Sequence, residues 1–154
     1  MVFEEIRSGG CCSYVVACGD TCAGVVIDPE LSQIDRTLAL IGKAGVRIHY
    51  VIDTHTHADH FSASRELARR LGVPRVMHRS SVAPDVDVRV DDGETLIAGH
   101  MRIRTVTTLP ANSDGWTDLT PNAASAHYRI RATRQDPRTG AVTHSRPSEA
   151  VRAN

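Results

Sequence analysis

The most informative stretch of the chain reads Thr54-His55-Thr56-His57-Ala58-Asp59-His60 and directly follows the apolar run Tyr50-Val51-Ile52-Asp53. It places three imidazoles and one carboxylate within six positions. In an extended chain, residues two apart point to the same side, so His55 and His57 can bind one ion together. Asp59 and His60 come where the chain turns toward the next helix, a position that suits a second ion or a catalytic base.

Imidazole nitrogens with one carboxylate match zinc, iron or manganese better than calcium or magnesium, which prefer oxygen ligands throughout. The position also favours function, because ligand sites of open α/β sheets form in loops at the carboxyl ends of strands. We therefore predict one or two ions, Fe(II) or Zn(II), bound by His55, His57, Asp59 and His60, with Asp59 as the catalytic residue.

Other titratable residues are given different roles. Asp53, at the end of the apolar run, is expected to orient a ligand histidine rather than to bind metal itself. His78 and His100 are interpreted as surface or partly hydrogen-bonded histidines outside the site. The four cysteines between positions 11 and 22 are interpreted as reduced thiols that pack as small hydrophobes on strands. A zinc role for the Cys18-x3-Cys22 spacing is the alternative.

Upstream of the motif, the pattern alternates between strand and helix. Segments 13–18 and 24–27 are short, rich in Val and bounded by Gly or Asp, which predicts two paired strands. Ser32 followed by Asp35 resembles a capping box, and apolar residues at helical spacing predict a helix that ends at Gly42 to Gly45. The run 48–53 then predicts a strand covered on both faces.

Downstream of the motif, the alternation continues. A helix is predicted from Ser62 to about Leu71, followed by a short strand over residues 76–77. Segments 94–97 and 101–106 flank a turn and predict a hairpin. This order of elements indicates an α/β layered fold.

The composition limits the classes of partner. The chain has 154 residues with 18 Lys+Arg and 18 Asp+Glu, so it predicts one small domain without a net charge that would attract nucleic acid. Its apolar runs fall far short of the roughly 20 residues that a membrane helix needs. Acidic residues stand where a secretory signal has basic ones, so we expect a cytoplasmic protein with no nucleic acid and no membrane as partner.

Apolar residues are unevenly distributed along the chain. Val, Ile, Leu, Met and Phe occur 33 times in residues 1–107 and five times in residues 108–154. So sparse a tail cannot bury enough apolar area to offset its chain entropy. We therefore expect a core-forming N-terminal portion over 1–107 and a divergent, weakly packed or disordered tail over 108–154.

The motif and its neighbours resemble the metallo-β-lactamase superfamily, whose αββα sandwich carries H-x-H-x-D-H in a loop after an apolar strand. Further matches are Gly9-Gly10-Cys11 with Ser13-Tyr14, Ile27-Asp28-Pro29-Glu30, the block 50–63 and Val90-Asp91-Asp92-Gly93-Glu94. Together they resemble the persulfide dioxygenase branch, with glyoxalase II type thioester hydrolases as nearest relatives. The resemblance runs from about Phe3 to Val106.

The resemblance stops after the predicted hairpin. Members of the family continue with a T-P-G-H-[ST] turn, whereas this chain reads Leu109-Pro110-Ala111-Asn112-Ser113-Asp114-Gly115, with Asn112 where a histidine ligand belongs. The family's later G-D segment and closing strands have no match. We therefore expect only the N-terminal part of the sandwich to be complete, leaving a sheet face uncovered and available for self-association.

The resemblance implies two enzyme functions and one alternative of another class. As a persulfide dioxygenase, the protein would hold one ferrous ion through His55 and oxidise glutathione persulfide with O2. As a glyoxalase II type hydrolase, it would hold one ion at His55 and His57 and another at Asp59 and His60, and cleave a glutathione thioester. The alternative is a catalytically inactive partial domain that retains some metal binding.

Overall fold

The computed structural model of the protein describes residues 1–57, 61–108, 127–128, 131–135 and 142–144. The helices are α1 (Ile34–Lys43) and α2 (Ser64–Leu71), with a short 3-10 helix, η1 (Leu31–Gln33), before α1. The strands are β1 (Val2–Ser8), β2 (Cys11–Ala17), β3 (Ala23–Ile27), β4 (Arg47–Ile52), β5 (Arg75–His78), β6 (Val88–Val90), β7 (Thr95–Ala98), β8 (Met101–Arg104), β9 (Thr107–Thr108), β10 (His127–Tyr128), β11 (Arg131–Gln135) and β12 (Val142–His144).

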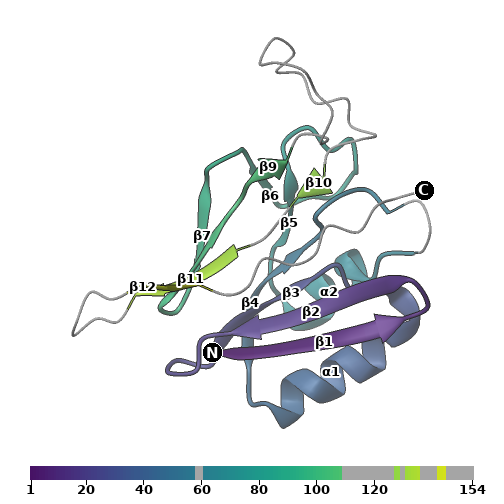
Figure 1. The fold of residues 1–154 in the computed structure, drawn as a ribbon. Helices are drawn as coiled ribbons and strands as arrows, with labels where there is room; N and C mark the ends of the chain where they lie inside the picture. The colour runs from purple at the N-terminus through teal and green to yellow at the C-terminus, as the bar shows by residue number, and fades with distance from the viewer. Residues whose placement is uncertain (58–60, 109–126, 129–130, 136–141, 145–154) are drawn as a thin grey trace.

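The first six strands form one sheet in the order β1-β2-β3-β4-β5-β6 (Figure 1). The pairs β1–β2 and β2–β3 are antiparallel, while β3–β4, β4–β5 and β5–β6 are parallel. Parallel neighbours end at the same edge of a sheet. The segments that follow β3, β4 and β5 therefore lie together at one edge, where the histidine motif is found.

Both helices cover one face of this sheet (Figure 1). Ile34 and Ile41 of α1 and Leu67 of α2 pack against sheet residues such as Val26 and Val51. Leu67 is fully buried, which stabilises the fold by roughly 1.5–3 kcal/mol relative to leaving it exposed. Gly72, with a φ of 66°, ends α2 in the left-handed conformation, as the sequence predicted.

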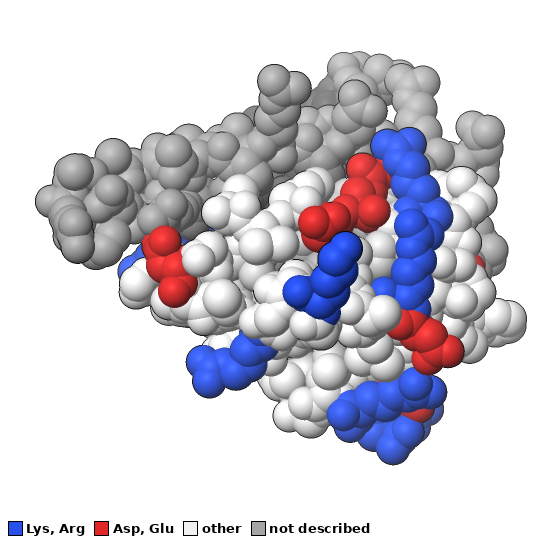
Figure 2. All heavy atoms as spheres, turned by 90° about the horizontal axis from the view of Figure 1, so that it is seen from below, with Lys and Arg blue, Asp and Glu red and all other residues white. Residues whose placement is uncertain are grey.

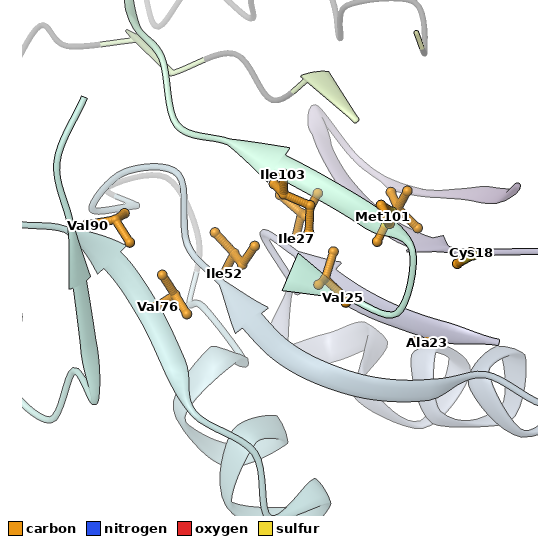
Figure 3. Close-up of a cluster of buried hydrophobic side chains, with 11 residues drawn as sticks. Cys18, Ala23, Val25, Ile27, Ile52, Val76, Val90, Met101 and Ile103 are labelled. Atoms are coloured by element: carbon orange, nitrogen blue, oxygen red, sulfur yellow. The ribbon is translucent and has the colours of Figure 1, made fainter. Parts of the chain in front are cut away.

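The second sheet, β12-β11-β8-β7, covers the opposite face. Figure 3 shows Met101 and Ile103 of β8 lying over Val25 and Ile27 of β3. Strand β4 is covered on both faces, because Val51 joins the helix-side core and Ile52 the core between the sheets. The described residues thus form helix, sheet and sheet layers, which confirms the predicted α/β sandwich architecture.

One expectation about surfaces is corrected by this packing. The apolar face of the first sheet is covered by β7 and β8 rather than left open. On the outer side of the second sheet, Ile97 is 52% exposed, but its cross-strand partner Arg102 and the neighbouring Arg104 are also exposed. That outer side, as far as the structure describes it, is mixed rather than apolar.

Two local predictions are also wrong. The Ser32 hydroxyl donates to Glu30 Oε1 at 2.6 Å rather than capping a helix, and α1 begins two residues later, after η1. The N-cap of α1 is Gln33, which makes no side-chain capping hydrogen bond. Cys22 is exposed, with a φ of 54° in the β2–β3 turn, so it does not pack as a strand hydrophobe, whereas Cys18 is buried.

Strands also occur where the sparse apolar content predicted loop-like chain. Ala132 of β11 pairs with Ile103 of β8, and β11 pairs in turn with β12. Ladder hydrogen bonds come from the backbone, so a strand can form without a run of apolar side chains. The boundary at residue 107 stays a prediction, and Asn112 lies outside the described residues.

Charges on the surface are mixed. Figure 2 shows Lys and Arg interleaved with Asp and Glu on the face seen there. Arg70 illustrates the pattern, since it contacts Glu66 of its own helix at 2.7 Å and Asp35 of α1 at 3.7 Å. Within the described part of the chain, no helix has both the length and the apolar character needed to cross a bilayer.

Candidate metal centre

The histidine motif leaves the sheet beside the end of β3. Because β3 and β4 are parallel neighbours, Asp28, directly after β3, lies next to the residues that follow β4. The Asp28 N–H donates to the carbonyl of Ile52 at 2.8 Å, and the Ser13 hydroxyl donates to the Asp28 carbonyl at 2.7 Å. Asp28 has a φ of 48°, a conformation that Asp adopts more readily than most residues. Its backbone is therefore fixed from both sides.

The Asp28 carboxylate gathers the start of the motif around it. Its Oδ1 accepts the Thr54 N–H at 2.7 Å, and its Oδ2 accepts the Thr54 hydroxyl at 2.6 Å. His57 Nε2 lies 3.2 Å from Oδ1. With three donors converging on one carboxylate, Asp28 acts as an orienting group for the motif.

These contacts assign the protons on both imidazoles. A carboxylate can only accept, so the Thr54 hydroxyl gives its single proton to Asp28 and must accept from His55 Nδ1, which lies 2.8 Å away. The lone pair of His55 is then on Nε2. By the same reasoning His57 donates from Nε2 to Asp28, and its lone pair is on Nδ1. Outer hydrogen bonds of this kind fix the tautomer of metal-binding histidines.

The two rings lie close enough to share an ion. Their centroids are 4.2 Å apart with an interplanar angle of 51°, and ligand atoms of Asp28, His55 and His57 lie within 4.8 Å of one another. The His57 side chain is only 4% exposed, whereas His55 is exposed. Two oriented imidazoles, one of them open to solvent, fit an iron or zinc ion.

Asp53 stabilises the elements next to the histidine loop. Its carboxylate is 1% exposed and pairs with Arg75 Nη2 at 2.9 Å. It also accepts the hydroxyls of Ser62, at 2.8 Å, and of Ser64 at the start of α2. Its distance to His57 Nε2 is 3.8 Å, so Asp28 rather than Asp53 makes the hydrogen bond that orients this histidine. Asp53 instead ties β4, β5 and α2 together beneath the motif.

The other predicted residues are distributed as follows. Asp59 and His60 lie outside the described residues, so their roles stay predictions. His78 ends β5 at the same edge, where its Nδ1 lies 2.7 Å from the Ser80 hydroxyl, and it lines a cavity with Asp53 and Thr54 between the two sheets. His100 lies at the other end of the molecule, in the β7–β8 turn.

Asp28 is the residue of this site that sequence reasoning missed, having named it only within the family match Ile27-Asp28-Pro29-Glu30. A signal was available. Parallel neighbours are usually joined through a helix and end at the same edge, so an acidic residue ending the first strand is a candidate partner for a motif ending the second.

A family model described as "Metallo-beta-lactamase superfamily" matches residues 7–121. The chain belongs to this superfamily. The match continues past Val106, where the recognisable motifs of the sequence end.

Individual relatives show which members of the superfamily the chain resembles. The chain is 34% identical over 107 residues to human "Persulfide dioxygenase ETHE1, mitochondrial", covering 68% of this chain and 40% of that protein. It is 36% identical over 92 residues to the hydroxyacylglutathione hydrolase of Anaeromyxobacter dehalogenans, covering 57% of this chain and 34% of that enzyme. The crystal structure of ETHE1 from Myxococcus xanthus superposes with a TM-score of 0.64 at 29% identity, covering 68% of this chain and 47% of that one. The chain thus spans between a third and two fifths of the length of these curated relatives.

Proposed function

We propose that this chain carries part of the ferrous-ion site of a persulfide dioxygenase that acts on glutathione persulfide. The observation that supports the proposal most is the oriented pair His55 and His57 at the carboxyl edge of the parallel strands, 4.2 Å apart at their ring centroids. The pair lies within the part of the chain that resembles persulfide dioxygenases. Such a site takes a small thiol-containing molecule rather than a macromolecule.

The residues of the histidine motif have separate roles in this proposal. His55 would hold the ion, with its lone pair placed on Nε2 by the Thr54 hydroxyl. His57, held by Asp28, and Asp59, as the catalytic residue predicted from the sequence, would shape the surroundings of the ion together with His60. A bound ferrous ion supplies open positions for dioxygen and for the persulfide sulfur. In the dioxygenase pattern, further ligands come from a later part of the chain.

A glyoxalase II type thioester hydrolase is the second candidate. The complete H-x-H-x-D-H motif favours it, since all four residues then serve as ligands, His55 and His57 for one zinc ion and Asp59 and His60 for another. The similarity to a hydroxyacylglutathione hydrolase supports the same candidate. Bound zinc would supply a hydroxide at neutral pH for attack on a glutathione thioester. The cytoplasmic location stays a prediction under either function.

The test is anaerobic reconstitution with Fe(II) or Zn(II), followed by gel filtration and measurement of retained metal. Oxygen uptake with glutathione persulfide in the iron-loaded protein supports the dioxygenase. Thioester cleavage in the zinc-loaded protein without oxygen uptake selects the hydrolase. Retained metal with neither activity indicates the inactive partial domain, and no retained metal contradicts all three.

Two variants assign the result to the motif. His55→Ala should abolish retention of Fe(II) and either activity. His78→Ala removes a histidine at the same edge that hydrogen-bonds Ser80, and it should retain metal. Equal loss of metal in both variants would contradict the assignment of His55 as a ligand.

A further inference from the structure

A second group of ligand-type side chains lies at the opposite end of β3 from the histidine motif. Cys18 and Asp20 belong to the turn between β2 and β3, and His100 belongs to the turn between β7 and β8. Ligand atoms of these three residues lie within 4.8 Å of one another, and His100 Nδ1 is 3.9 Å from Asp20 Oδ2. The group therefore joins the two sheets of the sandwich.

The close approach of the two turns depends on Gly99. This glycine has a φ of +58°, and a Cβ added to it would clash with the Thr21 hydroxyl and lie 2.9 Å from Ala23 Cβ. Below 3.0 Å such atoms must move apart, so the absence of a side chain lets the β7–β8 turn reach the β2–β3 turn. His100, the next residue, is placed beside Asp20 as a result.

Backbone hydrogen bonds hold Cys18 in this turn, and its sulfur is of a type that binds metal. It is 3% exposed, its N–H donates to the Ala23 carbonyl at 2.8 Å, and its carbonyl accepts the Cys22 N–H at 2.9 Å. The thiolate is the form that binds metal.

We propose that Cys18, Asp20 and His100 form a second cation site, suited to Zn²⁺, that links the two sheets. One thiolate, one carboxylate and one imidazole are donors that zinc accepts together, and the two negative charges neutralise the ion. The site is distinct from the histidine motif, which contains no sulfur ligand.

The distances are compatible with binding after a small closure. Ligands at zinc distances in a tetrahedron are separated by roughly 3.3–3.6 Å for this donor set, against 3.9 Å for the His100–Asp20 pair and at most 4.8 Å within the group. The side chains of His100 and Asp20 are 51% and 43% exposed, so both can rotate toward the buried sulfur. A water molecule would complete the tetrahedron on the exposed side.

Cobalt titration of the purified, reduced protein tests the proposal, because Co²⁺ replaces Zn²⁺ and gives a near-ultraviolet charge-transfer band only when a thiolate is bound. We expect such a band, and we expect added Zn²⁺ to displace it. Metal at the histidine motif gives no thiolate band, so the readout separates the two sites. Absence of the band overturns the proposal.

Variants assign the band to its ligands. Cys18→Ser should abolish it, whereas Cys22→Ser, in the same turn but exposed, should leave it unchanged. His100→Ala changes an exposed side chain and should weaken cobalt binding about tenfold or more while the fold, followed by circular dichroism, is kept. A band that survives Cys18→Ser, or cobalt affinity unchanged in His100→Ala, contradicts the proposal.

Discussion

The two ends of β3 place polar groups together by different means. At the carboxyl end, the Asp28 carboxylate holds the histidine motif through hydrogen bonds, and the buried Asp53, paired with Arg75, ties β4, β5 and α2 together beside it. At the other end, the β2–β3 turn meets the β7–β8 turn through the close approach of Gly99, with exposed Asp20 and His100 side chains. The histidine motif is therefore oriented by hydrogen bonds to a carboxylate, whereas the Cys18, Asp20 and His100 group is brought together by close approach of two backbone turns. Each prediction below tests one side of this contrast.

Asp53→Ala should have the largest effect. It leaves the Arg75 guanidinium, 11% exposed, without its buried carboxylate, and loss of one partner from a buried pair costs about 3–5 kcal/mol. Urea unfolding of the variant and the parent measures the loss. Asp91→Ala is the matched control. Its partner Arg79 is 57% exposed, so removal of the Asp91 carboxylate should change the unfolding midpoint little. Similar losses in both variants would show that the Asp53 pair does not brace the motif.

Gly99→Ala should have the next largest effect. The added methyl group must push the two turns apart, and overpacking of this kind costs about 1–3 kcal/mol beyond the backbone strain. Gly45→Ala separates the two contributions, since Gly45 has a φ of +61° but nothing within 4 Å of an added Cβ. Thermal unfolding of both variants gives the comparison. Equal destabilisation would mean that only the left-handed backbone matters and that the turns are not in close contact.

Thr54→Val should have a smaller effect on stability, about 1 kcal/mol, through the lost hydrogen bond to Asp28. It also removes the acceptor that fixes the His55 ring, so metal affinity should fall about 10–100-fold. Isothermal titration with Zn²⁺ measures this loss. Thr54→Ser keeps the hydroxyl and should bind like the parent; if it binds as weakly as Thr54→Val, the hydroxyl is not what sets the metal affinity.

Tyr14, on β2 beside the carboxyl end of β3, should give the smallest effect. Burial, followed by interactions with Cys12, raises its pKa from 10.0 to about 12. Between these values the unfolded chain loses the phenol proton while the folded chain keeps it, so the stability that is fully present below pH 10 falls as the pH rises toward 12. Denaturation of the parent and of Tyr14→Phe across this range should show a shallower alkaline loss in the variant. Parallel pH profiles would contradict the raised pKa.

Much of the fold follows from local pattern. The Val-rich runs became β2 and β3, and Gly72 ended α2, because side-chain periodicity and the conformational freedom of glycine act within a few residues. The predicted capping box at Ser32 failed, since Ser32 lies inside η1 and α1 begins only at Ile34. Strand β11 was not predicted, because its backbone pairs with β8 without the apolar run on which strand prediction relies.

The candidate site shows the same division. The residue types and spacing of His55 and His57 were enough to predict that both imidazoles can reach one ion, because that depends only on an extended backbone. The role of Asp28, the bracing of the loop by Asp53 and Arg75, and the meeting of Cys18 with His100 depend on which strands are neighbours. Local chain chemistry fixes the donors, but contacts between residues far apart in the chain exist only once the sheets have paired and packed.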